Sequence, residues 1–483
     1  MSIETKEVPG QPALALEAAL GADLVLGGAD VARYCSDWHG DVATGAVAVL
    51  RPRSTEDVSA CVKACAALGL SVVPQGGNTG LVLGAIPDRP ASQVILSLER
   101  MTRIRSIDAD DFSAVVEAGA ILSEFKDRVE EAGMFFPLAL GAQGSCRIGG
   151  NVSTNAGGIN VLRYGMTREL VLGLEVVLPD GSVFEGLSTL RKDNRGIDLK
   201  QLFIGAEGTL GIITAVAVKL MPQPEQVATA LIGLNALDDA ITLYRRARRD
   251  CCDLMSAFEF MPPLAFTLAR EAIPGLAMPM DGGYPAYVLM EISGSGLIDI
   301  EELMQRFLGA VLEDELVVDG VIANSRDQAR KLWLFREGMN EGQAKRGSHL
   351  RTDVSVPLSR LADFVRDAEA AVTEALPDCT CVSYGHVGDG NVHLNVLPPG
   401  DLPRAEIDAR IYKAKTVINT VLDTYRGSIS AEHGIGRLKK PDFEARLPAV
   451  QRKLLNAIKT AVDPTLVMNA GCQLNYTGDS GQS

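Results

Sequence analysis

The sequence predicts an α+β protein of several structural units, one of which carries an antiparallel sheet, with a helical segment at the C-terminal end. Three observations favour this class. The chain has 483 residues, which corresponds to about three units at about 150 residues per domain. Residues 46–74 follow a strand–helix–strand pattern. Residues 226–422 mix helices with short strands, which is typical of an α+β unit rather than of a doubly wound parallel sheet.

The strand–helix–strand pattern of residues 46–74 rests on helix signals. After a short apolar strand at 46–50, Ser54 is the expected N-cap, with Asp57 as its capping-box partner. Apolar side chains then recur at helical spacing as far as Gly69, which ends the helix. Cys61 and Cys65 share the apolar face, so we expect both to be core residues.

Further elements follow from local patterns. We expect a helix that Gly133 ends, a hairpin turn at Pro179-Asp180-Gly181 and a linker at Pro222-Gln223-Pro224. The expected strands are 70–73, 114–117, 174–178, 182–184, 212–220, 382–386 and 392–397, and the expected helix is 122–132.

Composition and charge exclude several classes of function. The net charge of −15 argues against nucleic acid and anionic membranes as partners, although a small anionic substrate needs only a local cationic pocket. The nine cysteines are scattered without CxxC spacing, which argues against a zinc ribbon or an iron–sulfur cluster. The acidic start of the chain is not typical of a secretory signal, and no run of eighteen apolar residues suggests a membrane span. We therefore expect a reducing, cytoplasmic location.

Three glycine-rich segments stand out among the 48 glycines of the chain. They are PQGGNTG at 74–80, GAQGSCRIGGNVSTNAGG at 141–158 and GAEGTLG at 205–211. Such loops can turn backbone N–H groups toward an anion, usually a phosphate. The alternative is a set of tight turns in a β-rich region, but three such segments with interleaved Ser, Thr and Asn favour binding. Neither GxGxxG nor a P-loop motif is present.

Two compact motifs contain three of the five histidines: YGHVGDGNVHLN at 384–395 and SAEHGIG at 430–436. Asp389-Gly390 predicts a hairpin turn that brings His386 and His393 to one side. Two histidines and a carboxylate with an open fourth position form a catalytic divalent-metal site of the zinc type, and a further histidine can act as a general base. Spacing alone leaves open whether Glu432 or His433 ligates the metal. The alternative is a set of histidines that orient loops by hydrogen bonds.

The glycine-rich segments, together with Tyr164-Gly165, resemble the FAD-binding domain of the vanillyl-alcohol-oxidase type across residues 46–222. In that family the first two loops hold the FAD pyrophosphate and the third borders the flavin and adenine. Relatives with covalent flavin often carry histidine where this chain has Asn78, so the resemblance implies non-covalent FAD. It assigns to FAD Pro74, Gln75, Gly76, Gly77, Asn78, Thr79, Gly80, Gly141, Ser145, Gly149, Gly150, Asn151, Thr154, Asn155, Gly157, Gly158, Tyr164, Glu207, Gly208, Gly211 and Ile212.

The histidine motifs resemble those of D-2-hydroxyacid dehydrogenases, most closely the D-2-hydroxyglutarate group, which extends the resemblance to residues 46–475. It implies an FAD-binding domain at 1–224, a substrate or cap domain at 225–422 with an antiparallel sheet, and a C-terminal segment at 423–483 that returns to the flavin. The implied roles are zinc or another divalent metal on His386, His393 and Glu432, a catalytic base at His433, and substrate contacts from Asn395 and Arg336.

Two departures from that group concern the distal end of the substrate. Arg351 stands where the group has lysine, two residues before Asp353, and Asn340 stands where the group has threonine. Arg351 keeps the positive charge with a different geometry. We expect Arg351 to contact substrate, but these changes leave the exact hydroxyacid open.

The resemblance implies oxidation of a D-2-hydroxyacid to the 2-oxoacid by hydride transfer to FAD. Without an iron–sulfur motif the next electron acceptor is external, with an electron-transfer flavoprotein or a quinone-linked carrier as candidates; a homodimer is left open. The alternatives are a D-lactate or glycolate dehydrogenase or oxidase of the same fold, a zinc metallohydrolase, and a non-catalytic flavin-binding protein.

Overall fold

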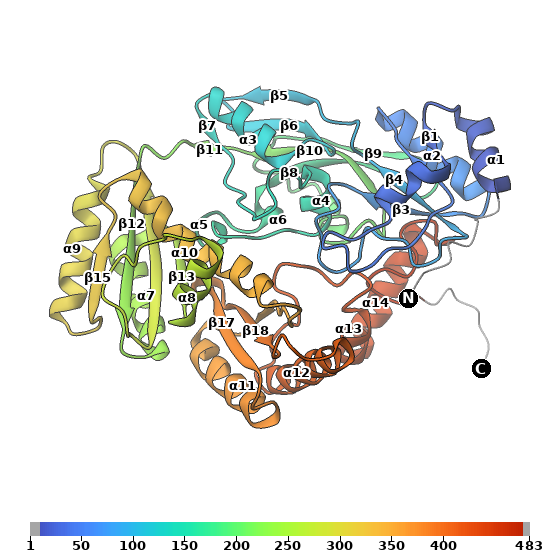
Figure 1. Cartoon of the computed structure of the whole chain (residues 1–483). Coiled ribbons are helices and arrows are strands. Elements are labelled where there is room, and N and C mark those ends of the chain that lie inside the picture. Colours follow the sequence, from blue (N-terminus) through green and yellow to red (C-terminus); the bar gives the residue numbers. More distant parts are fainter. Residues whose placement is uncertain (1–9, 477–483) are drawn as a thin grey trace. The chain divides into compact units, whose positions relative to one another are not determined.

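The structure is a computed structural model that describes residues 10–476, and these residues form two units (Figure 1). Unit 1 contains the chain up to Gly158, then Met166–Gln223, and the chain from Glu432 onward. Unit 2 contains Ile159–Gly165 and Pro224–Ala431. Residues 1–9, on which the expectation about a secretory signal partly depends, lie outside the described residues. The domain boundaries at 224, from the predicted Pro222-Gln223-Pro224 linker, and at 422 stay predictions.

Unit 1 contains two principal sheets. In the first, β2, β4 and β3 run parallel and β1 joins antiparallel; the second is antiparallel, in the order β5-β6-β10-β8-β9. A short β7–β11 pair is separate. Its strands are β1 (Val25–Leu26), β2 (Val49–Leu50), β3 (Ser71–Gln75), β4 (Gln93–Ser97), β5 (Ile104–Asp108), β6 (Ser113–Glu117), β7 (Met134–Phe135), β8 (Val171–Val177), β9 (Val183–Gly186), β10 (Ile212–Lys219) and β11 (Met221–Pro222).

The helices of unit 1 include two near the C-terminal end. They are α1 (Gly10–Leu20), α2 (Thr55–Ala67), α3 (Leu122–Glu131), α4 (Ile148–Ser153), α6 (Thr167–Leu170), α13 (Lys440–Arg446) and α14 (Ala449–Val462). The Nζ atom of Lys459 on α14 donates hydrogen bonds to the carbonyl oxygens of Thr209 at 2.6 Å and Met468 at 2.9 Å, and it pairs with Asp463 at 2.6 Å. Met468 in turn bridges in parallel to Val72 of β3. The C-terminal segment is therefore an integral part of this unit.

Unit 2 is built on one seven-stranded antiparallel sheet in the order β15-β12-β14-β13-β17-β18-β16. Its strands are β12 (Gln226–Leu234), β13 (Met255–Met261), β14 (Ala286–Gly294), β15 (Asp319–Ile322), β16 (Val354–Ser355), β17 (Thr380–His386) and β18 (Asn391–Leu397). Its helices are α5 (Val161–Tyr164), α7 (Leu237–Cys251), α8 (Leu264–Ala272), α9 (Ile300–Glu313), α10 (Arg326–Lys345), α11 (Leu361–Ala375) and α12 (Arg404–Thr424).

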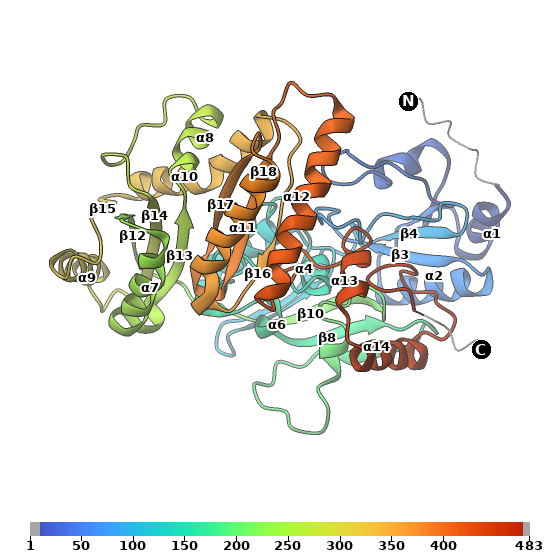
Figure 2. The same cartoon turned by 90° about the horizontal axis from the view of Figure 1, so that it is seen from below.

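Strand alternation divides the interior of unit 2 into two cores. On β14, Val288 and Met290 pack into a core with α7, α9, α11 and α12, whereas Tyr287 and Leu289 pack with α8 and α10. Successive side chains of a strand point to opposite faces, so a strand with helices on both faces is apolar throughout. Figure 2 shows α11 and α12 side by side along β17 and β18.

The predicted α+β class and antiparallel sheet are confirmed. Ser54 accepts a hydrogen bond from the backbone N–H of Asp57, as predicted for α2, although the Asp57 carboxylate accepts from Arg53 N rather than from the cap. The first strand is shorter than predicted, at Val49–Leu50, although Val47 N donates to Gln93 O at 2.9 Å and Ala48 O accepts from Ile95 N at 3.1 Å just before it. The turn at Gly390 includes a 3-10 turn, Val387–Asp389, before Gly390 takes a left-handed conformation.

None of the helices within residues 10–476 combines the length and the apolar character that crossing a bilayer requires.

Candidate active site

The three glycine-rich segments meet in unit 1. A Cβ atom added at Gly77 would lie 2.1 Å from the carbonyl oxygen of Ser145, so the first segment can pass the second only without a side chain. The third segment joins them through the backbone N–H of Glu207, which donates to Ser153 O at 2.8 Å. Gly208 lies against Pro74, where an added Cβ would be 2.8 Å from Cγ.

These segments line one cavity that is open to solvent. The predicted FAD residues that line it are Pro74, Gln75, Gly76, Gly77, Asn78, Thr79, Gly80, Gly149, Gly150, Asn151, Thr154, Glu207, Gly208, Gly211 and Ile212. His433, predicted as the catalytic base, also lines it.

Six predicted FAD residues are not among those lining the cavity: Gly141, Ser145, Asn155, Gly157, Gly158 and Tyr164. Gly158 passes too close to Ala139 for a side chain, since a Cβ there would lie 1.9 Å from its carbonyl oxygen. Tyr164 belongs to unit 2. The positions that do not line the cavity therefore include glycines that shape the second segment.

Several polar side chains at the cavity are hydrogen-bonded to the protein itself. The Gln75 amide donates to two backbone carbonyl groups, and the Asn78 amide donates to Ser36 O at 2.7 Å. Asn155, which belongs to the second segment but does not line the cavity, has a φ of +49° and accepts a hydrogen bond from the backbone N–H of Arg168 at 2.9 Å. These amides stabilise the loops, which leaves backbone groups as the main surface offered to a cofactor.

Arg147 is a cavity residue that we did not predict. It lies within GSCRIGG and lines the cavity, and its buried Nε atom has no hydrogen-bond acceptor among the described residues. A buried donor without an acceptor is costly, so this position fits an anionic ligand group such as a pyrophosphate. A lone arginine in a glycine-rich segment was the only signal that could have indicated it.

The carboxylate of Glu207, a residue predicted to border FAD, binds backbone N–H groups of the loop that follows His433. One oxygen accepts from the backbone N–H of Ile435 and the other from that of Gly436, both at 2.8 Å. The Gln473 amide donates to the first oxygen at 3.0 Å. Glu207 therefore holds the loop that follows His433, with Gly434 so close that an added Cβ would lie 2.8 Å from the carboxylate.

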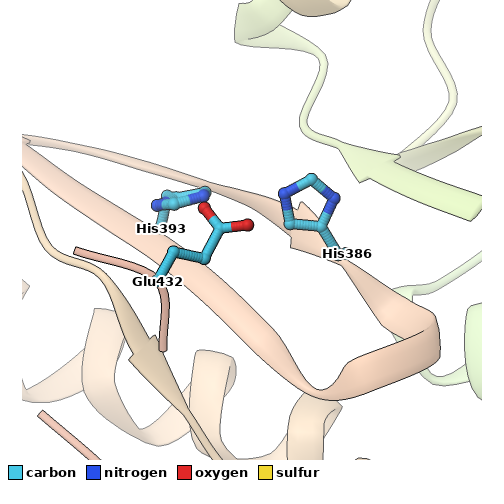
Figure 3. A group of neighbouring side chains, drawn as sticks. All are labelled: His386, His393 and Glu432. Atoms are coloured by element: carbon cyan, nitrogen blue, oxygen red, sulfur yellow. The ribbon is translucent and has the colours of Figure 1, made fainter. Parts of the chain in front are cut away.

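The predicted metal ligands lie together on the β17–β18 hairpin and just after the end of unit 2. Donor atoms of His386, His393 and Glu432 all lie within 4.8 Å of one another (Figure 3). His386 ends β17, and His393 stands on β18. Glu432 directly follows Ala431, the last residue of unit 2, so one peptide bond accounts for its place beside the hairpin.

Each histidine of this group is oriented through Nδ1. In His386 that atom lies 2.6 Å from Glu259 Oε1, and in His393 it lies 3.0 Å from Thr352 O. Metal-ligating histidines commonly make such a contact through one ring nitrogen and bind the metal through the other. Two imidazoles and one carboxylate arranged in this way suit zinc or a similar divalent ion. The donor set therefore fits the predicted metal.

Asp353 forms a second, overlapping group with Glu432 and His433, again within 4.8 Å. Asp353 is buried, and its oxygens accept hydrogen bonds from the Asn391 amide at 3.3 Å and the Ser430 hydroxyl at 3.2 Å. A buried carboxylate thus lies beside His433, the predicted base. Asp353 stands two residues after Arg351 in the sequence, and no role was predicted for it.

Arg336 is buried on α10 and held on two sides. Its Nε atom donates to Glu259 Oε2 at 2.9 Å, and its guanidinium carbon lies 4.7 Å from the centre of the Tyr384 ring. Among the described residues, none accepts a hydrogen bond from either Nη atom of Arg336. The two Nη atoms thus fit the carboxylate contact that the sequence predicts.

Asn395 is buried and fully engaged with the protein. Its Oδ1 atom accepts from the backbone N–H of Thr352, and its amide donates to Gln343 at 2.8 Å and to the Tyr384 hydroxyl at 3.2 Å. The Tyr384 hydroxyl donates to Asn340 Oδ1 at 2.7 Å, and burial raises the pKa of Tyr384. This network holds the Tyr384 ring under Arg336. Substrate contact by Asn395 stays a prediction.

Arg351 is exposed, and its Nε atom donates to His349 Nε2 at 3.3 Å. Neither Nη atom has an acceptor among the described residues. Arg351 and Asn340 both belong to unit 2 with Arg336, but Asn340 is already occupied by Tyr384. Of the two positions that depart from the related group, Arg351 is therefore the one that offers charge to a ligand.

Two family matches define the chain as a flavin-dependent oxidoreductase. The chain matches the FAD binding domain family over residues 46–186 and the family of FAD linked oxidases, C-terminal domain, over residues 223–472. Its fold is that of p-cresol methylhydroxylase, with a TM-score of 0.72, 17% identity and 97% of each chain covered. 4-Ethylphenol oxidase from Gulosibacter chungangensis gives a TM-score of 0.74, with 18% identity and 98% of each chain covered. This is the vanillyl-alcohol-oxidase type predicted above.

Relatives of known name indicate which group of flavin-dependent oxidoreductases the chain belongs to. The mitochondrial D-2-hydroxyglutarate dehydrogenase of Bos taurus is 40% identical over 433 residues, which cover 90% of this chain and 78% of that protein. A D-2-hydroxyglutarate dehydrogenase of Xanthomonas citri pv. viticola is 36% identical, with 92% of each chain covered. A Schizosaccharomyces pombe protein, named provisionally as a mitochondrial D-lactate dehydrogenase, is 37% identical over 93% of this chain and 85% of its own length. The chain belongs to the family of FAD-dependent D-2-hydroxyacid dehydrogenases.

Proposed function

We propose that the protein oxidises a D-2-hydroxyglutarate-like dicarboxylate to the 2-oxoacid with the assistance of a divalent metal. The observation that carries the proposal is the donor set of His386, His393 and Glu432, all within 4.8 Å, followed at once in the chain by His433, which lines the glycine-rich cavity. A metal site and a candidate base thus stand on consecutive residues. When bound, FAD supplies the hydride acceptor.

Side chains of the protein would bind the substrate, hold the metal and accept the proton. Arg336 binds the carboxylate next to the reacting carbon through its two Nη atoms, because Glu259 already holds Nε. His386, His393 and Glu432 would hold a divalent ion, which would supply Lewis-acid chemistry at the substrate hydroxyl. His433 accepts the hydroxyl proton, and the carboxylate of Asp353 stabilises the charged imidazole that results.

Metal removal tests the first part of the proposal. We expect D-2-hydroxyglutarate to bleach the flavin absorption under anaerobic conditions. A chelator should abolish bleaching while the flavin stays bound, and zinc, manganese or cobalt should restore it. His386→Ala and His393→Ala should behave like the chelated protein. Full turnover in both variants would refute the metal assignment.

Arg351 is proposed to bind the second carboxylate of the substrate, because it is an exposed cation whose Nη atoms have no acceptor among the described residues. Arg351→Ala should raise KM for D-2-hydroxyglutarate about tenfold or more, the loss of a charge-assisted hydrogen bond, and leave KM for D-lactate unchanged. Arg336→Lys serves as the control and should raise KM for both acids. A D-lactate or glycolate substrate is favoured instead if Arg351→Ala changes neither KM.

The non-covalent state of FAD is proposed from Asn78, whose amide bonds Ser36 O and whose position in the first loop carries histidine in relatives with covalent flavin. Acid precipitation should release all the flavin into the supernatant. Yellow colour that stays with the precipitate would contradict this.

For reoxidation we propose an external acceptor, an electron-transfer flavoprotein or a quinone-linked carrier, in a reducing compartment. The nine free cysteines support such a compartment. The names of several eukaryotic relatives place them in mitochondria, so cell fractionation is needed to test the predicted cytoplasmic location. Turnover with an artificial one-electron acceptor should exceed turnover with oxygen; the reverse would indicate an oxidase.

A further inference from the structure

One buried carboxylate in unit 2 contacts two of the functional side chains at once. Glu259 is 1% exposed and stands on β13, directly opposite His386 in the antiparallel pairing of β13 with β17. Its Oε1 atom lies 2.6 Å from His386 Nδ1, and its Oε2 atom accepts from Arg336 Nε at 2.9 Å. Each oxygen thus serves a different part of the site.

Both oxygens of the Glu259 side chain are engaged by these neighbours, and Arg336 faces it with a permanent positive charge. A buried carboxylate accepts strong, directional hydrogen bonds from both neighbours. It therefore restricts the rotation of the imidazole and of the guanidinium together.

We propose that Glu259 is a positioning residue of the dehydrogenase, which turns His386 so that its other nitrogen faces the metal and turns Arg336 so that its two Nη atoms face the substrate carboxylate. The inference rests on the proposed function, because it needs His386 as a metal ligand and Arg336 as a carboxylate ligand. Glu259 then fixes the position of the substrate relative to the metal, although it contacts neither of them.

A second carboxylate in the same sheet offers a matched control. Glu291, on the neighbouring strand β14, accepts from Trp333 Nε1 of α10 at 3.0 Å and from the hydroxyl groups of Thr229 and Ser256 at 3.1 Å. It supports the same helix as Glu259 does but contacts neither His386 nor Arg336. Glu291→Gln therefore reports the effect of weakening the sheet–helix packing alone.

The experiment compares Glu259→Gln with Glu291→Gln in the flavin-loaded protein. The glutamine keeps the size of the side chain, but its N–H₂ group must face either His386 Nδ1 or the Arg336 Nε–H group, so that one of the two hydrogen bonds is lost. The Kd for Zn²⁺ is measured on chelator-stripped protein by competition with a metal indicator, and KM and kcat are measured with D-2-hydroxyglutarate. We expect Glu259→Gln to weaken Zn²⁺ binding about 10- to 100-fold, as for other partners of metal-bound histidines, or to raise KM about tenfold, or both.

The outcomes separate the inference from the function on which it rests. Wild-type values of both Kd and KM in Glu259→Gln overturn the inference, as does an equal change in Glu291→Gln. If the glutamine variant does not fold, Glu259→Asp, which keeps the charge but withdraws both oxygens, is judged by the same two measurements. If the wild-type protein binds no Zn²⁺, the metal part of the proposed function fails, and KM then decides the Arg336 half of the inference.

Discussion

Replacing Glu207 by glutamine should uncouple the loop after His433 from the glycine-rich segment that holds it. The carboxylate accepts from the backbone N–H groups of Ile435 and Gly436, both at 2.8 Å, and from Gln473 at 3.0 Å. Glutamine keeps one acceptor oxygen and turns an N–H₂ group toward one of the two backbone donors. At least one charge-assisted bond is lost, which costs about 1.5–3 kcal/mol.

Stability and catalysis should both respond to Glu207→Gln. A loss of about 2 kcal/mol lowers the unfolding temperature by about 4–8 °C for a domain of 150–250 residues. Because His433 directly precedes the released loop, we expect kcat to fall at least tenfold while KM for the hydroxyacid changes little. Thermal unfolding of the holoprotein, followed by circular dichroism, and steady-state kinetics measure the two effects.

The control for this experiment is Glu175→Gln. Glu175 is another carboxylate of unit 1 and is hydrogen-bonded by Arg105, Thr55 and Thr214, with no contact to the His433 loop. It should lose comparable stability and keep its kcat. A Glu207→Gln variant with wild-type kcat, or a Glu175→Gln variant with the same loss of kcat, would refute the positioning of His433 by Glu207.

Three further predictions concern the framework. Gly77→Ala places a methyl group 2.1 Å from Ser145 O, so the purified variant should lack flavin absorbance; a normal flavin content would contradict the packing. Lys459→Met leaves Asp463 as an unpaired buried charge, which should cost about 3–5 kcal/mol, and an unchanged unfolding temperature would exclude this. Burial raises the pKa of Glu175, but hydrogen bonds from its neighbours lower it overall. The contribution of Glu175 to stability is therefore fully present above the unfolded pKa of about 4.3 and is lost as pH falls through the folded value. The stability difference between wild type and Glu175→Gln should shrink below about pH 4, and a difference that persists there would contradict the assignment.

The elements of the fold were predictable where their signals are local. The N-cap at Ser54 and the hairpin at Pro179-Asp180-Gly181 need only neighbouring residues, and both occur as predicted. The ends of strands were less predictable, because a strand extends only as far as its partner does. The first strand, Val49–Leu50, illustrates this, since its length depends on its pairing with β4.

The site shows the same division. The sequence by itself indicated the glycine-rich segments and the histidine motifs, because close spacing brings such side chains to one loop or hairpin whatever surrounds them. It could not indicate which carboxylates serve them: Glu259 stands 127 residues before His386, and Glu207 stands 228 residues before Ile435. Those pairings depend on which strands become neighbours in the sheet and on where the C-terminal segment returns. Burial in the folded chain then removes water as a competing hydrogen-bond donor, so that the carboxylate bonds the protein groups that face it.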